Sequence, residues 1–525
     1  DGFRNNPKTA MRESDLFPIL LRHYRDNPFL DTPFDCGKVP PVFNSKTCRQ
    51  AHWKALVPLV TQPEYDADIA KDFRDMAEMY LTRVIANKKW HSEIEVLDWD
   101  DVINGVPGKR GYDALNWNTS AGFPYNHVKK LLFTEPDSSG KRYMNCDLAA
   151  RTRQLERALQ CGKVYPVFST NLKDEVISEK KLQESKYRVF MASPIELTLV
   201  VRKYLLCIAR VMQLYPYTFG AAVGMNSNSV QWSDLARYLG FKSQTIPFWH
   251  KFYQAFDGDY VDFDKNMRAE VTSAVKHVIL TMVGTSYDAK VVATVSNILD
   301  VIFNPVVNYF GTFLQFRSLN PSGNSLTTQI NCIANNLFVR YCFVKKYPKT
   351  HPREFDRMVK VMTYGDDLLV SVRQSRLSCR DMQDILAKIN IKFTDANKNV
   401  EAQPFTEWNQ LTFLKRNFSW HDHNGLEVCH AQIDKKSIIK MLQWYSVDTS
   451  CTRAQQIQSS IRSAAIESYL HGFDFYEHMS ELVYTSLEEY MPGSGDVMGF
   501  PPYSELETWF MEAQDHKYRY DDPWW

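Results

Sequence analysis

Short apolar runs and longer helical stripes both occur in this chain, and each predicts its own kind of element. Runs rich in β-branched residues at 358–362 and 368–372 predict two strands, and an apolar run at 256–264 that ends in acids predicts another. Apolar positions spaced three and four apart predict helices at about 67–88, 267–282, 326–341, 380–390 and 457–469. The rest of the first 110 residues is rich in proline and aromatic side chains, so we expect loops and short elements there.

The strands predicted at 358–362 and 368–372 flank Gly365-Asp366-Asp367. Gly365 supplies the first central glycine that a two-residue type II′ turn needs, so we expect a hairpin with two carboxylates at its tip. Adjacent carboxylates repel, and each raises the other's pKa unless a cation lies between them. Because Mg²⁺ takes oxygen ligands, we interpret the tip as half a metal site. A solvated turn is the alternative, since turns favour these residues for backbone reasons alone.

The composition permits a large folded core and gives no sign of a global basic surface. Of 525 residues, 44% are apolar, 13% aromatic and 23% charged, which is typical of a globular protein with several units or lobes. Lys and Arg number 62 against 61 Asp and Glu, so any nucleic-acid channel must be local. Ten cysteines without a Cys-x-x-Cys pair favour reduced thiols in a cytosol-like compartment over a disulfide scaffold or a zinc knuckle.

The most apolar long stretches, 197–214 and 291–316, are interrupted by charged or amide side chains, so neither predicts a membrane span. No signal peptide is visible at the start of the chain. The chain opens at Asp1 and not at methionine, which is consistent with a fragment or with a piece cut from a larger polyprotein.

The loop at 118–124 carries groups suited to phosphates. It combines the hydroxyls of Thr119 and Ser120 with the flexible Gly122 and is closed by a proline. Such a loop can turn backbone N–H groups and hydroxyls toward phosphate oxygens. An ordinary turn is the simpler explanation of the same residues.

A second phosphate candidate runs from Lys173-Asp174-Glu175 to Arg188 and is called the basic ribbon here. It also holds Lys181, and lysine point charges with an arginine fork suit a triphosphate. The alternative is a solvated charged hairpin. The chain has no P-loop, so a nucleotide at this place would be held by side chains.

Two acids and a polar helix face are further candidates. Asp259 and Asp264 are five residues apart, so they lie at different depths along their element and do different jobs. After the loop at 321–324, three polar residues recur every four positions on one helix face: Thr327, Asn331 and Asn335. This stripe either faces water or aims Asn331 at a sugar hydroxyl.

Potential zinc ligands follow near the end of the motif-bearing region: His421, His423, Cys429 and His430. Their spacing matches no standard zinc pattern. A β-hairpin with alternating polar positions explains them more simply, and zinc is the less favoured alternative.

Together these segments resemble the RNA-dependent RNA polymerases of picorna-like positive-strand RNA viruses. In chain order, the resemblance covers the template-entry motif (Thr119-Ser120-Ala121-Gly122), the incoming-nucleotide motif (the basic ribbon), three catalytic motifs (Asp259 to Asp264; Ser322-Gly323 with Thr327 and Asn331; Tyr364-Gly365-Asp366-Asp367), the general-acid lysine (Lys398) and the primer-grip hairpin (Phe413-Leu414-Lys415-Arg416). Each motif is common alone, but the ordered set is specific. One departure is Ile177, where relatives often carry a phosphate-binding arginine, and this puts one triphosphate contact in doubt. Within the order, the resemblance suggests an arthropod-infecting member similar to iflaviruses or dicistroviruses.

The resemblance implies an α+β fold, the closed right hand with fingers, a palm that carries an antiparallel sheet, and a helical thumb. It divides the chain into fingers at 1–191 and 266–318, palm at 192–265 and 319–420, and thumb at 421–525. The implied activity is template-directed RNA synthesis, in which nucleotidyl transfer from NTPs to an RNA 3′-end replicates a viral genome.

Residue roles follow from the same resemblance. Asp259, Asp366 and Asp367 would hold two Mg²⁺ ions, or Mn²⁺ as a substitute, and Lys398 would be the general acid. Nucleotide contacts are implied for Lys173, Lys181, Arg188, Asp264, Ser322, Gly323, Thr327 and Asn331. Template or primer contacts are implied for Thr119, Ser120, Gly122, Lys415 and Arg416.

The implied partners are an RNA template and primer, NTPs, a genome-linked protein primer and other viral replication proteins. The implied location is the host cytoplasm, at membrane-associated replication complexes reached through partners. Two alternatives stay open. A reverse transcriptase or DNA polymerase shares the metal acids but should block the ribose 2′-hydroxyl, which Asp264 and Asn331 can instead hydrogen-bond. A non-catalytic RNA-binding scaffold would not need all the metal acids.

Overall fold

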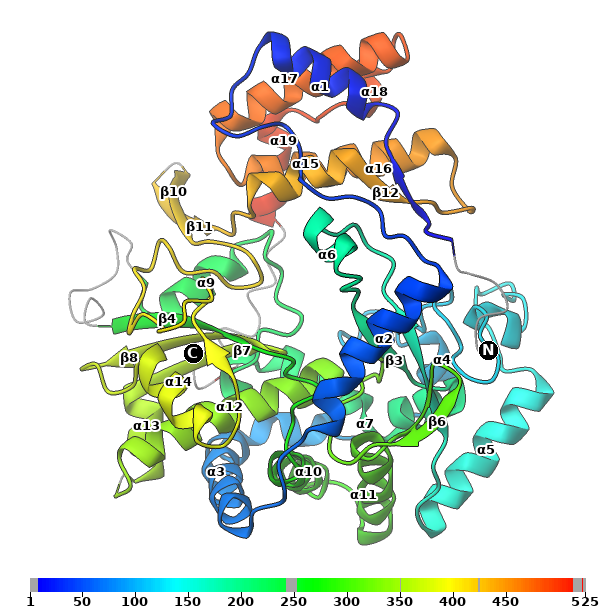
Figure 1. Cartoon of the computed structure of the whole chain (residues 1–525), viewed down its shortest axis with the longest axis vertical. Coiled ribbons are helices and arrows are strands. Elements are labelled where there is room, and N and C mark those ends of the chain that lie inside the picture. The colour runs from blue at the N-terminus through cyan, green and yellow to red at the C-terminus, as the bar shows by residue number, and fades with distance from the viewer. Residues whose placement is uncertain (1–7, 242–252, 350, 424, 513–521, 523–525) are drawn as a thin grey trace.

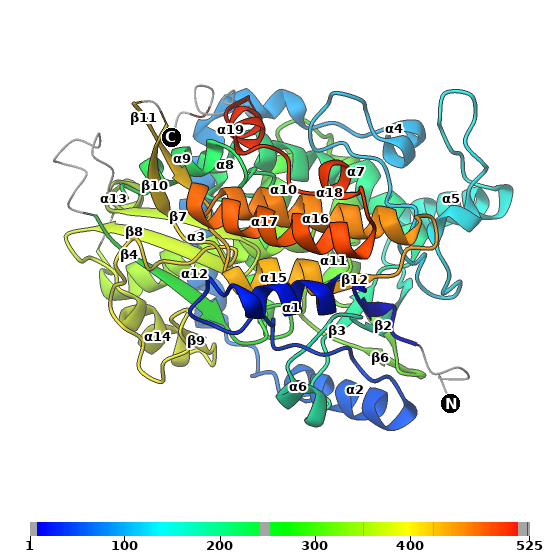
Figure 2. The same ribbon diagram turned by 90° about the horizontal axis from the view of Figure 1, so that it is seen from above.

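The computed structural model describes residues 8–241, 253–349, 351–423, 425–512 and 522. An upper layer of helices lies over two lower lobes, and each lower lobe is built around its own sheet (Figure 1). Seen from above, the long helices of the upper layer run side by side across the middle of the molecule (Figure 2). The names palm and fingers are used below for the two lower lobes and the name thumb for the upper layer, as the resemblance implies.

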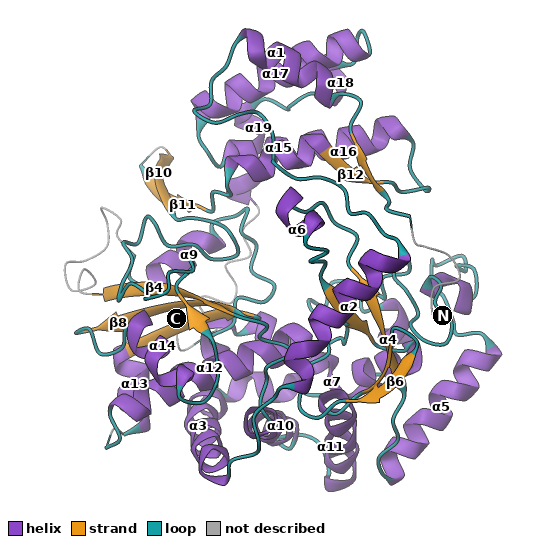
Figure 3. Ribbon diagram, in the orientation of Figure 1, coloured by secondary structure: helices purple, strands orange, loops and turns teal. Residues whose placement is uncertain are grey.

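The palm lobe is built on an antiparallel sheet with the strand order β7-β8-β4-β9. Its strands are β4 (Tyr253–Tyr260), β7 (Val359–Tyr364), β8 (Asp367–Arg373) and β9 (Phe393–Thr394). Its helices are α3 (Ala67–Ala86), α8 (Pro216–Phe219), α9 (Gln231–Tyr238), α12 (Thr327–Lys346), α13 (Pro352–Met358) and α14 (Cys379–Ala387). Figure 3 shows α12 and α13 on one side of the sheet and α9 on the other.

Both faces of this sheet are buried. Along β8, Leu368, Val370 and Val372 join the large core that includes α12. Leu369 points the other way, into a smaller cluster with Trp232 of α9. Burial on both faces explains why 368–372 reads as a continuous apolar run without polar alternation.

The fingers lobe holds a sheet with the order β3-β2-β5-β6, in which β2 pairs with β3 antiparallel and with β5 parallel. Its strands are β2 (Val167–Leu172), β3 (Val189–Ala192), β5 (Val306–Tyr309) and β6 (Thr312–Gln315). Its helical elements are α2 (Ser45–Val60), η1 (Lys88–Glu93), α4 (Trp99–Asn104), η2 (Lys129–Leu132), α5 (Cys146–Cys161), α6 (Glu179–Gln183), α7 (Ile195–Leu214), α10 (Ala269–Val283) and α11 (Ala289–Phe303). One core joins this lobe to the palm, because α7, α10 and α12 contribute to the same cluster.

The thumb layer is mainly helical. Its helices are α15 (Lys435–Gln443), α16 (Arg453–Tyr469), α17 (Phe473–Tyr490), α18 (Gly495–Met498) and α19 (Tyr503–Glu512). The strand β12 (Trp444–Ser446) follows α15, and the hairpin of β10 (Ser419–His423) and β11 (Leu426–His430) leads into the layer.

The N-terminal helix packs on the thumb layer, although the resemblance assigns residues 1–191 to the fingers. Apolar residues of α1 (Phe17–Asp26), among them Phe17, Leu20 and Tyr24, pack with Ile438 of α15 and Met479 of α17. The strand β1 (Met11–Glu13) also pairs antiparallel with β12 of the thumb. Residues 1–7 lie outside the described residues, and the predicted lobe boundaries stay predictions.

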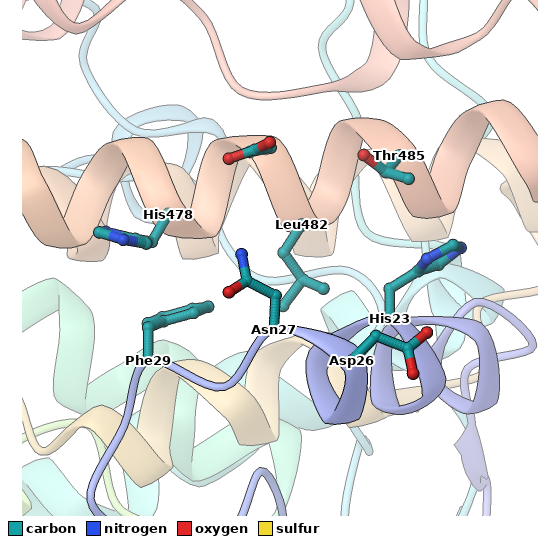
Figure 4. A pocket seen from close by; sticks show the side chains of 8 residues that line it. His23, Asp26, Asn27, Phe29, His478, Leu482 and Thr485 are labelled. Atoms are coloured by element: carbon teal, nitrogen blue, oxygen red, sulfur yellow. The ribbon is translucent and has the colours of Figure 1, made fainter.

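A pocket of about 190 Å³ lies between α17 and the end of α1 (Figure 4). Figure 4 shows His478 stacked beside Phe29 at one end and His23 with Asp26 at the other. The two rings at Phe29 and His478 are 5.1 Å apart between centroids. The pocket confirms that α1 and α17 face each other.

Most predicted elements are present. The helices expected at 67–88, 267–282, 326–341, 380–390 and 457–469 correspond to α3, α10, α12, α14 and α16. Outside the helix at 67–88, the expectation of loops and short elements in the first 110 residues was wrong for α2, a helix of 16 residues. Its signal was the capping box in which Asn44 and Thr47 exchange side-chain and backbone hydrogen bonds. Pro58 near its end obscured the pattern.

All ten cysteines are free thiols, as the sequence predicts. The apolar stretch at 197–214 forms α7, whose side chains are mostly buried in the fingers–palm core. Among the described residues, no helix has both the length and the apolar character that crossing a membrane requires.

Candidate active site

The hairpin of β7 and β8 carries the predicted carboxylate tip. Tyr364 pairs with Asp367, so Gly365 and Asp366 are the two central residues of the turn. Of these two, Gly365 alone has a positive φ, +64°, as expected for the type II′ turn predicted from the sequence. The turn leaves Asp366 exposed at the tip and Asp367 at the start of β8.

Helix α12 holds this turn from below through residues whose roles the sequence did not reveal. Asn335 Nδ2 donates to the carbonyl oxygens of Gly365 and Asp366, at 3.3 and 3.1 Å. Its Oδ1 accepts a hydrogen bond of 3.0 Å from the Tyr260 hydroxyl. The backbone N–H of Gly365 points at Cys332 Sγ, 3.1 Å away. Asn335 lies on the predicted polar stripe, which was the one signal for it, whereas nothing local marked Cys332.

Asp259 meets the tip from the adjacent strand. The register of β4 and β8 pairs Gly258 with Leu368, so Asp259 and Asp367 lie at neighbouring strand ends. Burial, followed by the carboxylates of Asp366 and Asp259, raises the pKa of Asp367 to about 6. Although Asp366 is exposed at the tip, partial loss of hydration around its carboxylate raises its pKa as well, and Asp259 adds to this. The three acids, called the carboxylate site, therefore interact as the sequence predicts.

The donor chemistry of the carboxylate site fits divalent metal ions, because oxygen ligands that repel one another are stabilised by a cation between them. Within the described part of the chain, no group of three or more His, Cys, Asp or Glu side chains is already close enough to hold a metal ion. The assignment of individual metal ligands stays a prediction.

Lys398 reaches the carboxylate site from the loop after β9. Its Nζ lies 2.9 Å from Asp259 Oδ2, although most of the side chain is exposed. Asp395 shapes this loop: its carbonyl oxygen accepts the Lys398 N–H at 2.9 Å, and its carboxylate accepts two hydrogen bonds from Asn399. Lys398 also has a positive φ of +60°. The structure thus places a cationic group beside Asp259, and its role as a proton donor stays a prediction.

Asp264 and Asn331 are hydrogen-bonded to each other, with Asn331 Nδ2 as the donor. Asn320 Nδ2 donates to Asn331 Oδ1 at 2.7 Å, and Asn324 Nδ2 donates to Asn320 Oδ1 at 2.8 Å. Burial raises the pKa of Asp264 to about 6, although the hydrogen bond from Asn331 lowers it. Since Asn331 is buried, the predicted polar stripe does not face water at this position.

The loop before α12 is clamped to the end of β3. A Cβ at Gly323 would overlap the carbonyl oxygen of Met191, so only glycine allows this approach. Thr327 Oγ1 donates to the carbonyl oxygen of Pro321 at 2.8 Å, which closes the loop, and Ser322 is left exposed. The structure therefore brings the loop beside the basic ribbon, of which β3 is the continuation.

Within the basic ribbon, Glu175 lies between Lys173 and Arg188. Its carboxylate is 3.4 Å from Lys173 Nζ and 3.6 Å from Arg188 Nη1. The positive charge of Arg188 lowers the pKa of Asp264 and Asp366 against the effect of burial, so Arg188 faces the site. Lys181 lies apart from this group, exposed on the short helix α6.

Ile177 departs from the family pattern for a structural reason. Its side chain is buried with Ala51 and Tyr187 in a small cluster. Its backbone exchanges two hydrogen bonds with Val39, at 2.8 and 2.9 Å. This position supports the ribbon from behind and does not face a nucleotide.

The predicted template loop is a compact turn. Ser120 pairs with Val128 in an isolated bridge, and Ser120 Oγ accepts the N–H of Gly122 at 3.1 Å. Thr119 Oγ1 donates to Asn116 at 2.9 Å and accepts from Lys129. Both hydroxyls therefore bond within the loop, and their contact with a template stays a prediction.

The predicted primer-grip hairpin is present, but its two basic residues differ. Phe413 and Arg416 exchange backbone hydrogen bonds of 2.9 Å, and Leu414 and Lys415 between them both have positive φ. Lys415 is exposed, and its charge lowers the pKa of Asp367 against burial. Arg416 instead forms a two-pronged ion pair of 2.7 Å with Glu467 of α16 and donates to Ala431 O. Lys415 is therefore the better candidate for a contact with the primer, whereas Arg416 links its hairpin to the thumb helix α16.

The histidine-rich segment forms the predicted β-hairpin of β10 and β11. His423 Nε2 lies 3.1 Å from His430 Nε2, and His423 Nδ1 lies 2.8 Å from Glu507 of α19. The rings of His421 and His430 stack with centroids 4.2 Å apart. The hairpin with packed rings accounts for these residues.

Comparison with known proteins adds the family. The model of the family described as "Viral RNA-dependent RNA polymerase" matches residues 48–489, which is most of the chain. This chain belongs to that family. Members use divalent metal ions in general, and the carboxylate site lies within the matched region.

Curated relatives of this viral RNA-dependent RNA polymerase are viral polyproteins. The genome polyprotein of human hepatitis A virus genotype IA (isolate GBM) is 26% identical over 505 residues, covering 92% of the chain and 20% of the relative. The RNA1 polyprotein of grapevine fanleaf virus is 27% identical over 446 residues, covering 81% of the chain and 18% of the relative. The chain thus spans about a fifth of the length of these relatives. The narrower placement in an arthropod-infecting group stays a prediction.

Among solved structures, the Sicinivirus 3Dpol RNA-dependent RNA polymerase is similar, with a TM-score of 0.72 and 19% sequence identity. The similarity covers 96% of each chain. It confirms the predicted α+β right-hand fold for this polymerase.

Proposed function

We propose that this chain catalyses template-directed RNA synthesis, adding nucleotides from NTPs to an RNA 3′-end. The observation that supports this most directly is the meeting of Asp259, Asp366 and Asp367 at neighbouring strand ends. Lys398, from a loop more distant in sequence, reaches the same place. Neighbouring carboxylates repel one another and raise one another's pKa, which destabilises the fold. Such clusters are typical of functional sites, where the charges are needed for chemistry.

Asp259, Asp366 and Asp367 would hold the divalent metal ions, proposed here to be Mg²⁺ with Mn²⁺ as a substitute. Bound there, the ions would activate the primer 3′-hydroxyl and neutralise the leaving pyrophosphate. Lys398, beside Asp259, is proposed to supply a proton to the leaving group, which a lysine can do and an arginine cannot.

Substrate selection is proposed for the surrounding residues. Asp264 and Asn331 already hydrogen-bond each other, and their remaining oxygen lone pairs and N–H can bind a ribose 2′-hydroxyl. Lys173, Lys181 and Arg188 are proposed to contact the triphosphate as cations. Lys415, at the tip of its hairpin beside Asp367, is proposed to contact the primer backbone.

The test is primer extension on an RNA template with ribonucleotides or deoxyribonucleotides in separate reactions. We expect extension with ribonucleotides, and Asp366→Asn should abolish it while Asp384→Asn, a change at an exposed helix carboxylate, should not. Efficient extension with deoxyribonucleotides alone would identify a reverse transcriptase or DNA polymerase. RNA binding without any extension would identify a non-catalytic scaffold.

We also propose that the polymerase acts in the host cytoplasm, at membrane-associated complexes reached through other viral replication proteins. The polyprotein relatives support such partners, since a polyprotein yields several proteins together. In flotation with liposomes, the purified chain should stay unbound until the other replication proteins are added. Binding by the chain alone would contradict this. A genome-linked protein primer is a further proposed partner, tested by transfer of labelled nucleotide onto that protein.

A further inference from the structure

A buried carboxylate lies behind Asp259 on the same strand. Asp257 is two residues before Asp259 in β4, so the two side chains point to the same face of the palm sheet. The register of β4 and β8 places Asp257 opposite Leu369, which packs in the smaller palm cluster with Trp232. Asp257 is only 4% exposed, and burial raises its pKa. Because a carboxylate is costly to bury among apolar side chains, it needs hydrogen-bond donors there.

The main partner of Asp257 is the residue that leads into the primer-grip hairpin. Asp257 Oδ2 accepts the N–H of Thr412 at 2.8 Å and the Thr412 hydroxyl at 3.1 Å. Hydrogen bonds to an ionised acceptor are roughly twice as strong as those between neutral groups. A neutral amide could accept the same N–H, so the carboxylate is the residue type that fixes Thr412 most firmly.

The hairpin after Thr412 reaches the carboxylate site. Phe413 is buried in the same palm cluster, which holds the base of the hairpin against the sheet. A backbone hydrogen bond from Leu414 and the charge of Lys415 both lower the pKa of Asp367 against burial. The tip of the hairpin therefore faces the carboxylate site, and Thr412 fixes its start.

The buried carboxylate also faces the loop that carries Lys398. A hydrogen bond from the backbone of Ala396 lowers the pKa of Asp257 against burial. Ala396 lies two residues before Lys398, and Thr394 of β9 pairs with Asp259. Two segments that approach the carboxylate site from different parts of the chain are therefore held by one buried group.

We propose that Asp257 is a positioning residue that fixes the primer-grip hairpin, and with it the primer 3′-end, relative to Asp259. The inference rests on the proposed polymerase function and deepens it. Because Asp257 and Asp259 share one strand, a shift of the hairpin away from the metal ligands would break the two hydrogen bonds to Thr412. A reacting hydroxyl that is slightly misplaced slows the chemical step, whereas the affinity for the NTP does not depend on it.

The test compares variants at both ends of this contact. Asp257→Asn keeps the size of the side chain and removes its charge, Thr412→Val removes the hydroxyl donor, and Thr412→Ser keeps it. Glu156→Gln is the matched control, since Glu156 is a buried carboxylate of the fingers with two partners of its own. It accepts from the Tyr204 hydroxyl at 2.7 Å and lies 2.8 Å from Lys203 Nζ.

Three kinetic quantities are measured for each variant. They are the single-turnover rate of one addition at saturating NTP, the affinity for that NTP, and the ratio of addition rates from a matched and a mismatched primer end. The fluorescence of 2-aminopurine at the primer 3′-end reports the placement of that end in bound RNA without any catalysis. The melting temperature, Tm, reports the stability of the fold.

For Asp257→Asn we expect roughly tenfold slower addition from a matched primer, with the NTP affinity unchanged within about twofold. A mismatched end is already displaced, so its extension should slow less, and the matched-to-mismatched ratio should fall roughly fivefold. The 2-aminopurine signal should change as well. Thr412→Val should show smaller changes of the same kind. Thr412→Ser and Glu156→Gln should match the wild type in kinetics and fluorescence, whatever the Tm of Glu156→Gln.

Two results would overturn the proposal. One is an Asp257→Asn variant that adds nucleotides as fast as Glu156→Gln, and the other is equal slowing from matched and mismatched ends, which a merely structural role predicts. If Asp257→Asn does not fold, the comparison of Thr412→Val with Thr412→Ser gives the same decision. A wild type that binds RNA but adds no nucleotide would reject the proposed function. An unchanged 2-aminopurine signal in Asp257→Asn would then reject the positioning role separately.

Discussion

Asn331→Ala should weaken the preference of the enzyme for ribonucleotides. The change removes the Nδ2 donor to Asp264 and the Oδ1 acceptor of the 2.7 Å hydrogen bond from Asn320. Because the pair of Asp264 and Asn331 is the proposed reader of the 2′-hydroxyl, its loss affects ribonucleotides and leaves deoxyribonucleotides nearly unchanged.

The magnitude follows from the contacts. A hydrogen bond to a charged group contributes about 1.5–3 kcal/mol, and the amide left at Asn320 adds about 1 kcal/mol of lost stability. Loss of the donor should also raise the pKa of Asp264 above its value of about 6, because the hydrogen bond from Asn331 lowers it. For the substrate, one lost hydrogen bond to the 2′-hydroxyl should reduce the ribose preference roughly 5- to 30-fold.

The assay measures kcat/KM for a ribonucleotide and for its deoxy analogue from pH 6 to pH 8.5. Asn297→Ala is the matched control, because it removes one 2.8 Å hydrogen bond to Leu159 in the fingers, away from the site. The control should lose some thermal stability and keep the sugar preference. An equal fall of kcat/KM for both sugars in Asn331→Ala would refute the reasoning and make the pair purely structural.

Three further predictions follow from the carboxylate site. Asp366→Asn should abolish extension and leave RNA binding nearly intact, because it removes a metal-ligand charge; substantial extension in Mg²⁺ would contradict the metal assignment. Lys398→Leu should slow single-nucleotide incorporation by roughly 10²–10⁴-fold at unchanged nucleotide affinity, and Lys398→Arg should restore part of the rate. Full activity of Lys398→Leu would show that Lys398 is an exposed lysine without a catalytic role. The raised pKa of Asp367, about 6, means that its stability contribution is fully present below about pH 4 and is lost as pH rises through 6. In EDTA, the free energy of unfolding of Asp367→Asn should therefore exceed that of the wild type by about 1–2 kcal/mol at pH 8. This difference should disappear near pH 4. A difference that does not change with pH would contradict the explanation.

Local patterns predicted the parts of this protein that depend on residues close in sequence. The stripe through Ile330, Ile333 and Leu337 predicted α12, because side chains three and four apart share one helix face. Gly365 predicted the turn because a two-residue loop between paired strands needs a positive φ there. The ordered set of motifs then identified the family, which no single motif could do.

The sequence failed where a residue's role depends on a partner far along the chain. Arg416 was predicted to contact the primer, but its guanidinium forms an ion pair with Glu467 of α16. The N-terminal residues were assigned to the fingers, whereas the apolar face of α1 packs against α15 and α17. A sequence shows which side chains are charged or apolar, but it does not show which distant residue forms the ion pair or the packing contact.

The sequence by itself determined which residues could carry the chemistry, because the types of side chain and their local spacing are sequence properties. The tertiary structure alone decided which of them act together. It placed Lys398 on Asp259, Asn335 under the turn and Thr412 on Asp257. These contacts arise when separate strands and helices bury their apolar faces against one another, and that packing depends on the whole chain at once.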